Sequence, residues 1–246
     1  MISLVLVLVA TPDAYRQEVE SWRKEMESSL RRPEGWLAVS ALAWLQEGVN
    51  LVGASAEASV RLPKGAPSIA GALHVRGGEV SFKAAKDAFL VDGEPAREAS
   101  LKTDAQGRAS RVKIGDLTFV VLERGGRLAV RLWNPNSPNR TQFQGRKWFP
   151  VDARFRIEAD FRPYPTPKSV PILDVLGNTN NATVPGYAEF TIGGKRVRLE
   201  GEQSGDGLFF NFRDGTSGKE SYPASRFLYA EAPKNGKVVL DFNRAY

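Results

Sequence analysis

The sequence contains no cysteine and only one histidine, His74, among its 246 residues. It therefore lacks the side chains for a thiol nucleophile, an iron–sulfur site, a zinc finger or a zinc centre with several histidines. We predict no metal and no cofactor. His74 precedes a Gly-Gly turn at a polar strand position, which favours a surface histidine over a general base and disfavours a Ser-His-Asp triad.

Long apolar runs are also missing. The apolar segment at residues 1–10 (MISLVLVLVA) is too short to span a bilayer, and we predict no transmembrane segment. Two interpretations stay open for it: the hydrophobic region of a secretory signal, or a buried N-terminal strand. No basic residues precede it, and Leu8 stands where a signal has a small residue. A polar helix follows at once and leaves the apolar segment no evident surface to pack on, so we favour the signal interpretation. This predicts a periplasmic or secreted protein; if the segment is a buried strand, we expect a cytoplasmic protein.

Residues 11–35 predict an amphipathic helix. Thr11, Pro12 and Asp13 are typical of a helix start, and Pro33 and Gly35 of its end. Apolar residues recur between them at spacings of three and four, which places them on one face. They are Tyr15, Val19, Trp22, Met26 and Leu30.

After Gly35, short apolar segments alternate with turn pairs such as Asp92-Gly93 and Asn235-Gly236. This pattern predicts an all-β fold with two packed antiparallel β units, each sandwich-like or barrel-like. Residues 36–45 are apolar on all sides and form either a short buried helix or a strand. The clearest strands are expected at residues 80–82, 88–91, 117–122, 128–132, 155–161, 188–192, 208–212 and 238–242.

A loop rich in Asn, Pro and Gly at residues 134–145 separates two groups of strands. The predicted organisation is a leader at 1–10, a helix at 11–35, an N-terminal β-sandwich unit at 36–133 and a C-terminal β unit at 146–246. The two groups are either separate small domains or the two sheets of one sandwich. The sequence does not indicate an oligomeric state.

The net charge of +6 is concentrated in one segment. Residues 124–168 contain ten basic and three acidic residues, a net charge of +7, which leaves −1 for the rest of the chain. Three interpretations stay open: a solvated strand face, a surface for a small anionic ligand or an anionic envelope, and, least favoured, a site for single-stranded nucleic acid. If the segment is a solvated strand face, alternation along residues 154–162 places Phe155, Ile157, Ala159 and Phe161 on the inward face and the charged residues on the outward face.

A loop at residues 213–220 (RDGTSGKE) combines glycines, hydroxyls and a lysine after an apolar strand. Successive backbone N–H groups in such a loop form anion-binding nests, with Thr216 and Lys219 as further contacts. Arg213 and Glu220 differ from the phosphate-binding P-loop motif at its first and last positions. A plain hairpin loop is the competing interpretation.

Asp214, Tyr222, Arg226 and Asp241 are candidates for a cluster of carboxylates, phenol and guanidinium. The alternation of residues 241–244 (DFNR) places Asp241 and Asn243 on one face of the last strand. Such a cluster either locks the C-terminus structurally or forms a catalytic or binding site.

Three stretches carry a family resemblance: residues 35–50 (GWLAVSALAWLQEGVN), 148–156 (WFPVDARFR), and 212–220 (FRDGTSGKE) through 241–246 (DFNRAY). From about residue 22 to its end, the sequence resembles the bacterial domain of unknown function 1684 family. The resemblance implies a bacterial protein, often with a signal or lipoprotein leader, and no known activity. It also implies a Pro-rich tail with two cysteines after Asn-Arg-Ala-Tyr, where the present sequence ends.

The N-terminal half is also similar to a forkhead-associated β-sandwich, through residues 49–53 (VNLVG), 60–63 (VRLP), 68–71 (SIAG), 91–93 (VDG) and 114–115 (IG). The phosphopeptide contacts of that fold do not carry over. Ala54, Gly71 and Asp92 stand where it has Arg, His and Asn, so the resemblance implies a fold only.

Two functions remain open. The first is an envelope or secreted binding protein for an anionic small molecule or polymer, with nucleic acid as the least favoured partner. Its predicted ligand-binding residues are Arg131, Lys147, Arg154, Arg156, Thr216, Lys219, Arg226 and Asn243. The second is a hydrolase-like enzyme on an anionic substrate, with Asp214, Tyr222 and Asp241 as catalytic candidates. We favour the first, because no residue spacing satisfies a catalytic template.

Overall fold

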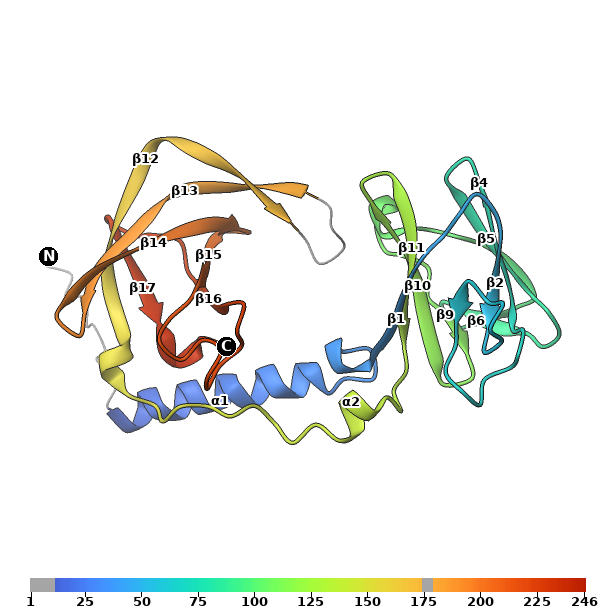
Figure 1. Ribbon diagram of the computed structural model, residues 1–246, viewed down its shortest axis with the longest axis horizontal. Helices are drawn as coiled ribbons and strands as arrows, with labels where there is room; N and C mark the ends of the chain where they lie inside the picture. Colours follow the sequence, from blue (N-terminus) through green and yellow to red (C-terminus); the bar gives the residue numbers. More distant parts are fainter. Residues whose placement is uncertain (1–11, 174–178) are drawn as a thin grey trace, which may run out of the picture. The chain divides into compact units, whose positions relative to one another are not determined.

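A computed structural model describes residues 12–173 and 179–246 of the chain (Figure 1). The leader predicted at residues 1–10 lies outside the described residues. No helix among the described residues combines the length and apolarity that crossing a membrane requires. The chain divides into two compact units, which we call the C-terminal unit (residues 12–24 and 147–246) and the central unit (residues 25–146).

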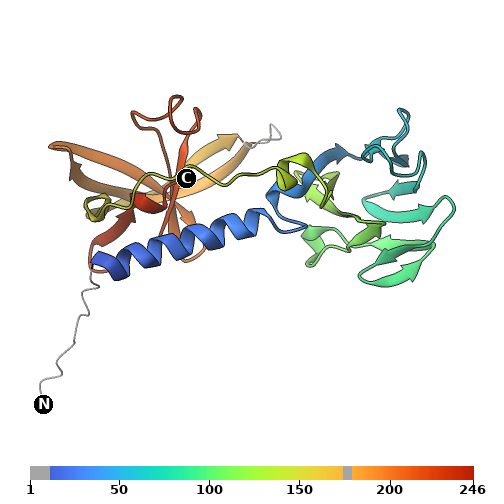
Figure 2. The ribbon, with the colours of Figure 1, turned by 90° about the horizontal axis from the view of Figure 1, so that it is seen from below.

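The N-terminal helix forms as the sequence predicts. Helix α1 spans Pro12–Leu30 and is drawn as one continuous blue coil in Figure 2. Its apolar stripe faces the protein: Tyr15 and Val19 are buried in the C-terminal unit. Trp22, one turn further on, packs edge to face against Trp148, with 5.9 Å between ring centroids. Burial of this one face stabilises the helix more than its intrinsic propensity does.

The central unit is a sandwich of two sheets, so the predicted all-β fold class is confirmed. One sheet has the order β1-β11-β10-β9-β6-β7 and the other β3-β2-β4-β5-β8. Residues 36–45, left open by the sequence, begin as a short 3-10 helix at Trp36–Ala38 and continue as strand β1. The strands are β1 (Val39–Trp44), β2 (Gly48–Gly53), β3 (Val60–Arg61), β4 (Gly71–Arg76), β5 (Glu79–Ala84), β6 (Phe89–Val91), β7 (Glu94–Ala96), β8 (Glu98–Leu101), β9 (Val112–Ile114), β10 (Leu117–Arg124) and β11 (Arg127–Trp133). The unit also contains helix α2 (Pro138–Thr141) and a 3-10 turn at Asp104–Gln106.

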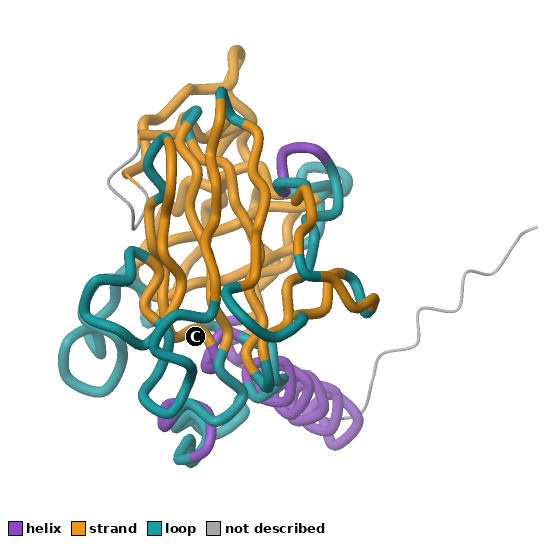
Figure 3. The backbone as a smooth tube through the Cα atoms, turned by 90° about the vertical axis from the view of Figure 1, so that its right-hand side faces the viewer, coloured by secondary structure: helices purple, strands orange, loops and turns teal. Residues whose placement is uncertain are grey.

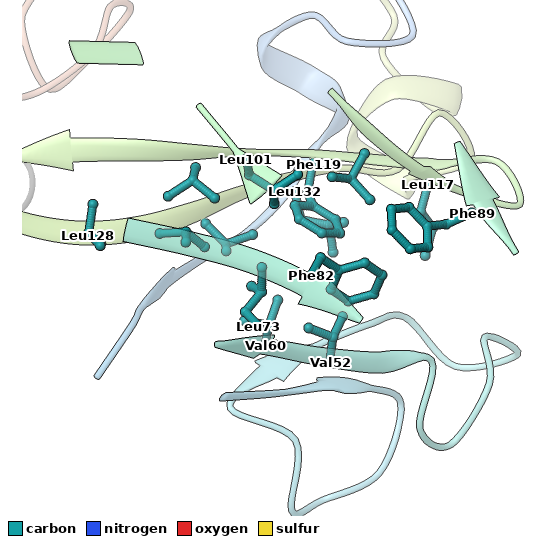
Figure 4. Close-up of a cluster of buried hydrophobic side chains, with 14 of the residues drawn as sticks. Val52, Val60, Leu73, Phe82, Phe89, Leu101, Leu117, Phe119, Leu128 and Leu132 are labelled. Atoms are coloured by element: carbon teal, nitrogen blue, oxygen red, sulfur yellow. The ribbon is translucent and has the colours of Figure 1, made fainter. Parts of the chain in front are cut away.

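The core of the central unit lies between its two sheets and is dominated by aromatic and branched side chains (Figure 4). Phe82 is fully buried, and its ring packs edge to face on Phe89 and Phe119 at centroid distances of 4.6 and 5.6 Å. Leu73 and Val75 alternate with exposed or half-buried residues along β4, which is the period of a strand with one buried face.

The C-terminal unit contains one curled antiparallel sheet, shown in yellow to red in Figure 1. Figure 3 draws the strands of both units in orange. Its order is β16-β15-β14-β13-β12-β17, and its two end strands lie next to each other. The chain end helps to close it, because Phe227 and Tyr246 exchange two backbone hydrogen bonds. The strands are β12 (Arg156–Leu173), β13 (Thr179–Ile192), β14 (Lys195–Ser204), β15 (Gly207–Phe212), β16 (Arg226–Ala230) and β17 (Lys237–Asp241).

Strand β12 runs through four prolines that would end most strands. The pairing of β12 with β13 shifts between Pro163 and Lys168, so Pro165 and Pro167 lie in an irregularity of the ladder, while Pro163 and Pro171 are paired with residues of β13. Proline has no N–H to donate and is tolerated where the ladder is interrupted. The charged strand β14 and the short β16 were missed by the sequence prediction.

We expect Phe82→Ala to lower the free energy of unfolding by about 3–5 kcal/mol, because it removes a fully buried ring and leaves a cavity between the sheets. Urea denaturation followed by circular dichroism measures this change. The control is Phe155→Ala. Phe155 is 44% exposed, so this substitution should change stability by no more than about 0.5 kcal/mol. Equal losses in the two variants would contradict the assigned core.

Candidate functional site

A buried hydrogen-bond network joins α1 to the chain end. The Asp241 Oδ1 atom accepts hydrogen bonds from the Tyr15 hydroxyl at 2.8 Å, the Asn243 backbone N–H at 3.2 Å and the Asn243 amide at 3.1 Å. The same Asn243 amide donates to the Tyr15 oxygen at 2.8 Å and to the Asp152 carbonyl at 2.9 Å. Asp241 and Asn243 are both buried, and each polar side chain finds partners there.

The sequence expectation for residues 241–244 is corrected by this geometry. Strand β17 ends at Asp241, and Phe242–Arg244 form a 3-10 turn. The Asp241 carboxylate accepts a hydrogen bond from the Asn243 N–H at the start of this turn. Asp241 and Asn243 therefore converge because of a helical turn and not because of strand alternation. The reason is the carboxylate itself, which caps the turn and competes with continuation of the strand.

Two arginines support the network from the solvent side. Arg23 of α1 donates to the Asn243 carbonyl at 3.2 and 2.8 Å and to the Phe149 carbonyl at 3.0 Å, and its guanidinium lies 4.8 Å from the centroid of Trp148. Arg244 pairs with Glu18 and approaches Asp241 Oδ2 at 3.3 Å. Sequence analysis identified the apolar face of α1 but missed Arg23 and the hydroxyl of Tyr15, because no local pattern marks a partner more than 200 residues away.

A second, separate cluster holds Asp214. Its Oδ1 atom accepts from the Thr216 backbone N–H at 2.8 Å and hydroxyl at 2.5 Å, and its Oδ2 accepts from Arg226 at 2.9 Å. Burial favours a higher pKa for Asp214, but the bonds from Thr216 and Arg226 outweigh it and hold the pKa below its usual value. Arg226 also donates to the Ala245 carbonyl at 3.0 Å, so this cluster anchors the end of the chain.

The loop at 213–220 forms its hydrogen bonds within itself. The N–H groups of Thr216, Ser217, Lys219 and Glu220 bond to Asp214 or to the Thr216 carbonyl, and that of Gly218 bonds to the Ser221 carbonyl. Five successive amides are therefore bonded within the loop, which favours the hairpin over the nest, the two interpretations that the sequence left open. The binding roles of Thr216 and Lys219 stay predictions.

Among the described residues, the three catalytic candidates form no hydrogen bond to one another. Asp241 is bonded to Tyr15 and Asn243, whereas Asp214 is bonded to Thr216 and Arg226. Tyr222 is 63% exposed and takes part in neither network. Among residues 12–173 and 179–246, no group of three or more His, Asp or Glu side chains is placed to hold a metal ion.

The predicted cations Lys147, Arg154 and Arg156 are all exposed along one segment of the C-terminal unit, residues 147–156. Two aromatic rings of the same segment are also exposed, Phe149 by 41% and Phe155 by 44%. We call these five side chains the cationic–aromatic segment. Asn243 holds it in place, since its side-chain oxygen accepts from the Asp152 N–H at 2.9 Å.

The three cations differ in their bonding. Arg154 forms a two-pronged ion pair with Asp152, at 2.9 and 2.6 Å, and its side chain is 87% exposed. Arg156 faces Asp241 across the pairing of β12 with β17. Within the described part of the chain, Arg156 and Lys147 form no side-chain hydrogen bond or ion pair, so both charges are available to a partner.

The predicted faces of the strand at 154–162 are partly wrong. Phe155 belongs to a 3-10 turn, Ala153–Phe155, that precedes β12, so its ring points away from the core. The inward positions Ile157, Ala159 and Phe161 are confirmed as core residues. On the outward side, Asp160 pairs with Lys237 of β17 at 2.6 Å, as expected of a solvated strand face.

The last predicted ligand residue, Arg131, belongs to β11 in the central unit and not to the C-terminal unit of the other candidates. It lies between Leu42 of β1 and Val120 of β10 in the sheet and is half-buried. Its role in ligand binding stays a prediction.

We expect Tyr15→Phe to alter the pH dependence of stability. Burial, then the hydrogen bond to Asp241, raise the pKa of Tyr15 above its usual value of 10. Above pH 10 the unfolded chain loses this proton while the native state keeps it, so the free energy of unfolding falls as pH rises. The fall approaches about 1.4 kcal/mol per pH unit for this group and is absent in Tyr15→Phe.

Urea denaturation of both proteins at pH 8 and pH 11 measures the difference. At pH 8 the variant should be less stable by about 1–3 kcal/mol, because Asp241 and Asn243 each lose a buried partner. The deficit should shrink at pH 11. A constant deficit would contradict the assigned environment of Tyr15.

Comparison with known proteins gives a family for the C-terminal part. The family described as "Protein of unknown function (DUF1684)" matches residues 141–246. A solution NMR structure of an uncharacterized protein of Haloarcula marismortui is similar at 29% identity, with a TM-score of 0.38, over 44% of the present chain and 63% of that protein. No curated protein matches the chain. The resemblance first recognised in the C-terminal motifs is thus confirmed for residues 141–246, which match the DUF1684 family of proteins of unknown function.

Proposed function

We propose that the protein is a non-catalytic binding protein of the bacterial envelope, and that the cationic–aromatic segment binds an anionic polymer. The observation that carries this proposal is the exposure of Lys147 and Arg156, whose side chains form no hydrogen bond or ion pair among the described residues, beside the exposed side chains of Phe149 and Phe155. Cations next to aromatic rings attract an anionic chain by charge and contact its less polar parts through the rings. The envelope location rests on the apolar residues 1–10 of the sequence.

An extended partner suits this surface better than a small molecule does. The side chains follow one another along a surface segment and do not converge on a buried point, whereas small ligands are usually enclosed by a cleft. A polymer with repeated negative charges contacts several such cations at once, and their modest individual contributions add up.

The bonds around the candidate carboxylates favour this function over the hydrolase alternative. A general acid or base must reach the substrate, yet Asp241 is buried under Tyr15 and Asn243. Asp214 is partly exposed, but its Oδ1 atom is bonded to Thr216 and its Oδ2 atom to Arg226. If Asp214 or Asp241 took part in catalysis, these hydrogen bonds would have to break and form again in each catalytic cycle.

We expect the double variant Lys147→Ala/Arg156→Ala to bind dextran sulfate about tenfold more weakly than the wild type. This corresponds to about 0.7 kcal/mol for each exposed charge. Fluorescence anisotropy with labelled dextran sulfate measures the affinity, and raised salt should weaken wild-type binding because exposed charges are screened.

The matched control is Lys195→Ala/Arg213→Ala. It removes the same net charge from two exposed positions of the C-terminal unit outside the cationic–aromatic segment. It should retain most of the affinity. Equal weakening in both double variants would show that only net charge determines the affinity, which would contradict a role of the cationic–aromatic segment. Absence of binding by the wild type would refute the proposal.

A further inference from the structure

The central unit carries a cleft on the outer face of β4, β5 and β8. Its volume is about 590 Å³, and strands from the sheet form its floor. This volume falls within the range of about 300–1,000 Å³ that is usual for small-molecule sites. No predicted ligand residue of the C-terminal unit lines it, so the cleft is distinct from the cationic–aromatic segment.

One row of polar side chains crosses the floor of the cleft. In the register of the sheet, His74 of β4 lies opposite Ser81 of β5, and Ser81 lies opposite Ser100 of β8. Directly opposed residues have Cβ atoms about 4.5–5.5 Å apart, so the imidazole and two hydroxyls stand side by side. The neighbouring positions Val80 and Phe82 point into the core, which fixes the row on the outer face.

Cationic side chains flank this row. Arg76 and Lys102 line the cleft, and so does Lys83, which is 3.6 Å from Glu98 in a pair whose side chains are both about 60% exposed. Among the described residues, the side chains of His74, Ser81, Ser100, Arg76 and Lys102 form no hydrogen bond or ion pair. Five polar groups with donor capacity thus face one open cleft without internal partners.

Acceptors are present as well. Glu79 lines the cleft and lies opposite Arg76 in the register, and Glu98 lies opposite Lys83. Carboxylates accept hydrogen bonds from hydroxyl groups, and the cations and serines donate to an oxyanion. The lining therefore suits a ligand that carries both negative charge and hydroxyl groups better than it suits an apolar one.

We propose that this cleft binds a small polyhydroxylated anion, a sugar phosphate or sugar acid in chemical class. Arg76 and Lys102 contact the anionic group, His74, Ser81 and Ser100 form the floor of the site, and Glu79 and Glu98 accept from the sugar hydroxyls. This site adds a small-molecule ligand in the central unit to the polymer-binding function proposed above, and it does not depend on that function.

His74 makes the proposal testable with a single-residue signal, because it is the only histidine of the chain. We expect its imidazole resonances, followed by NMR in the full chain without a histidine tag, to shift on titration with glucose 6-phosphate and with glucuronate. Glucose and inorganic phosphate, which each supply half of the chemistry, should bind at least tenfold more weakly.

The variant Arg76→Ala/Lys102→Ala should weaken glucose 6-phosphate binding at least tenfold. The control Lys64→Ala/Lys113→Ala removes two exposed lysines of the same unit that do not line the cleft, and it should bind like the wild type. The variant Lys147→Ala/Arg156→Ala should also bind normally, which separates this test from that of the polymer.

Three results would overturn the proposal. They are no shift of the His74 signals at millimolar concentrations of either anionic sugar, inorganic phosphate binding as tightly as glucose 6-phosphate, and equal weakening in the cleft variant and its lysine control.

Discussion

The hydrogen bonds of the Asp241 carboxylate hold several parts of the C-terminal unit together. A buried carboxylate is costly unless its oxygens are bonded; here Tyr15 and Asn243 donate to Oδ1, and Arg244 lies 3.3 Å from Oδ2. Tyr15 thereby fixes the start of α1 against β17, and Asn243 fixes the segment at Asp152 that leads into β12. The positions of the exposed cations at 147–156 follow from this network, because the backbone that carries them is anchored by Asn243.

The same network bears on function. The two carboxylates that are catalytic candidates form internal hydrogen bonds, Asp241 with Tyr15 of α1 and Asp214 with Thr216 and Arg226. Arg23 and Arg226 likewise donate to the carbonyls of Asn243 and Ala245 near the chain end. The positive charge left for a partner is therefore smaller than composition indicates, and among the predicted ligand residues of segment 147–156 it rests chiefly on Lys147 and Arg156.

Much of the fold could be predicted, because alternation and turn residues act locally. Asp92-Gly93 and Asn235-Gly236 form turns with positive φ at both residues, as their sequence indicates. Strand β14 was missed because its charged residues outnumber its apolar ones, although Val197 and Leu199 alternate toward the core. The site was harder to predict. Asp241 contacts Tyr15, which lies 226 positions away in the sequence. Strand periodicity also does not predict that the strand ends at Asp241, whose carboxylate caps the following turn.

The surroundings of His74 could not be predicted from the sequence either. Taken alone on β4, it has the features of a surface histidine, since the residues next to it in sequence are apolar or belong to a turn. The pairing register supplies its actual neighbours, Ser81 and Ser100, from two other strands. A row across a sheet is set by how strands pair, which depends on hairpin geometry and on which face is buried. Side chains that are unremarkable in each strand therefore become a cleft with donors and acceptors only when the sheet forms.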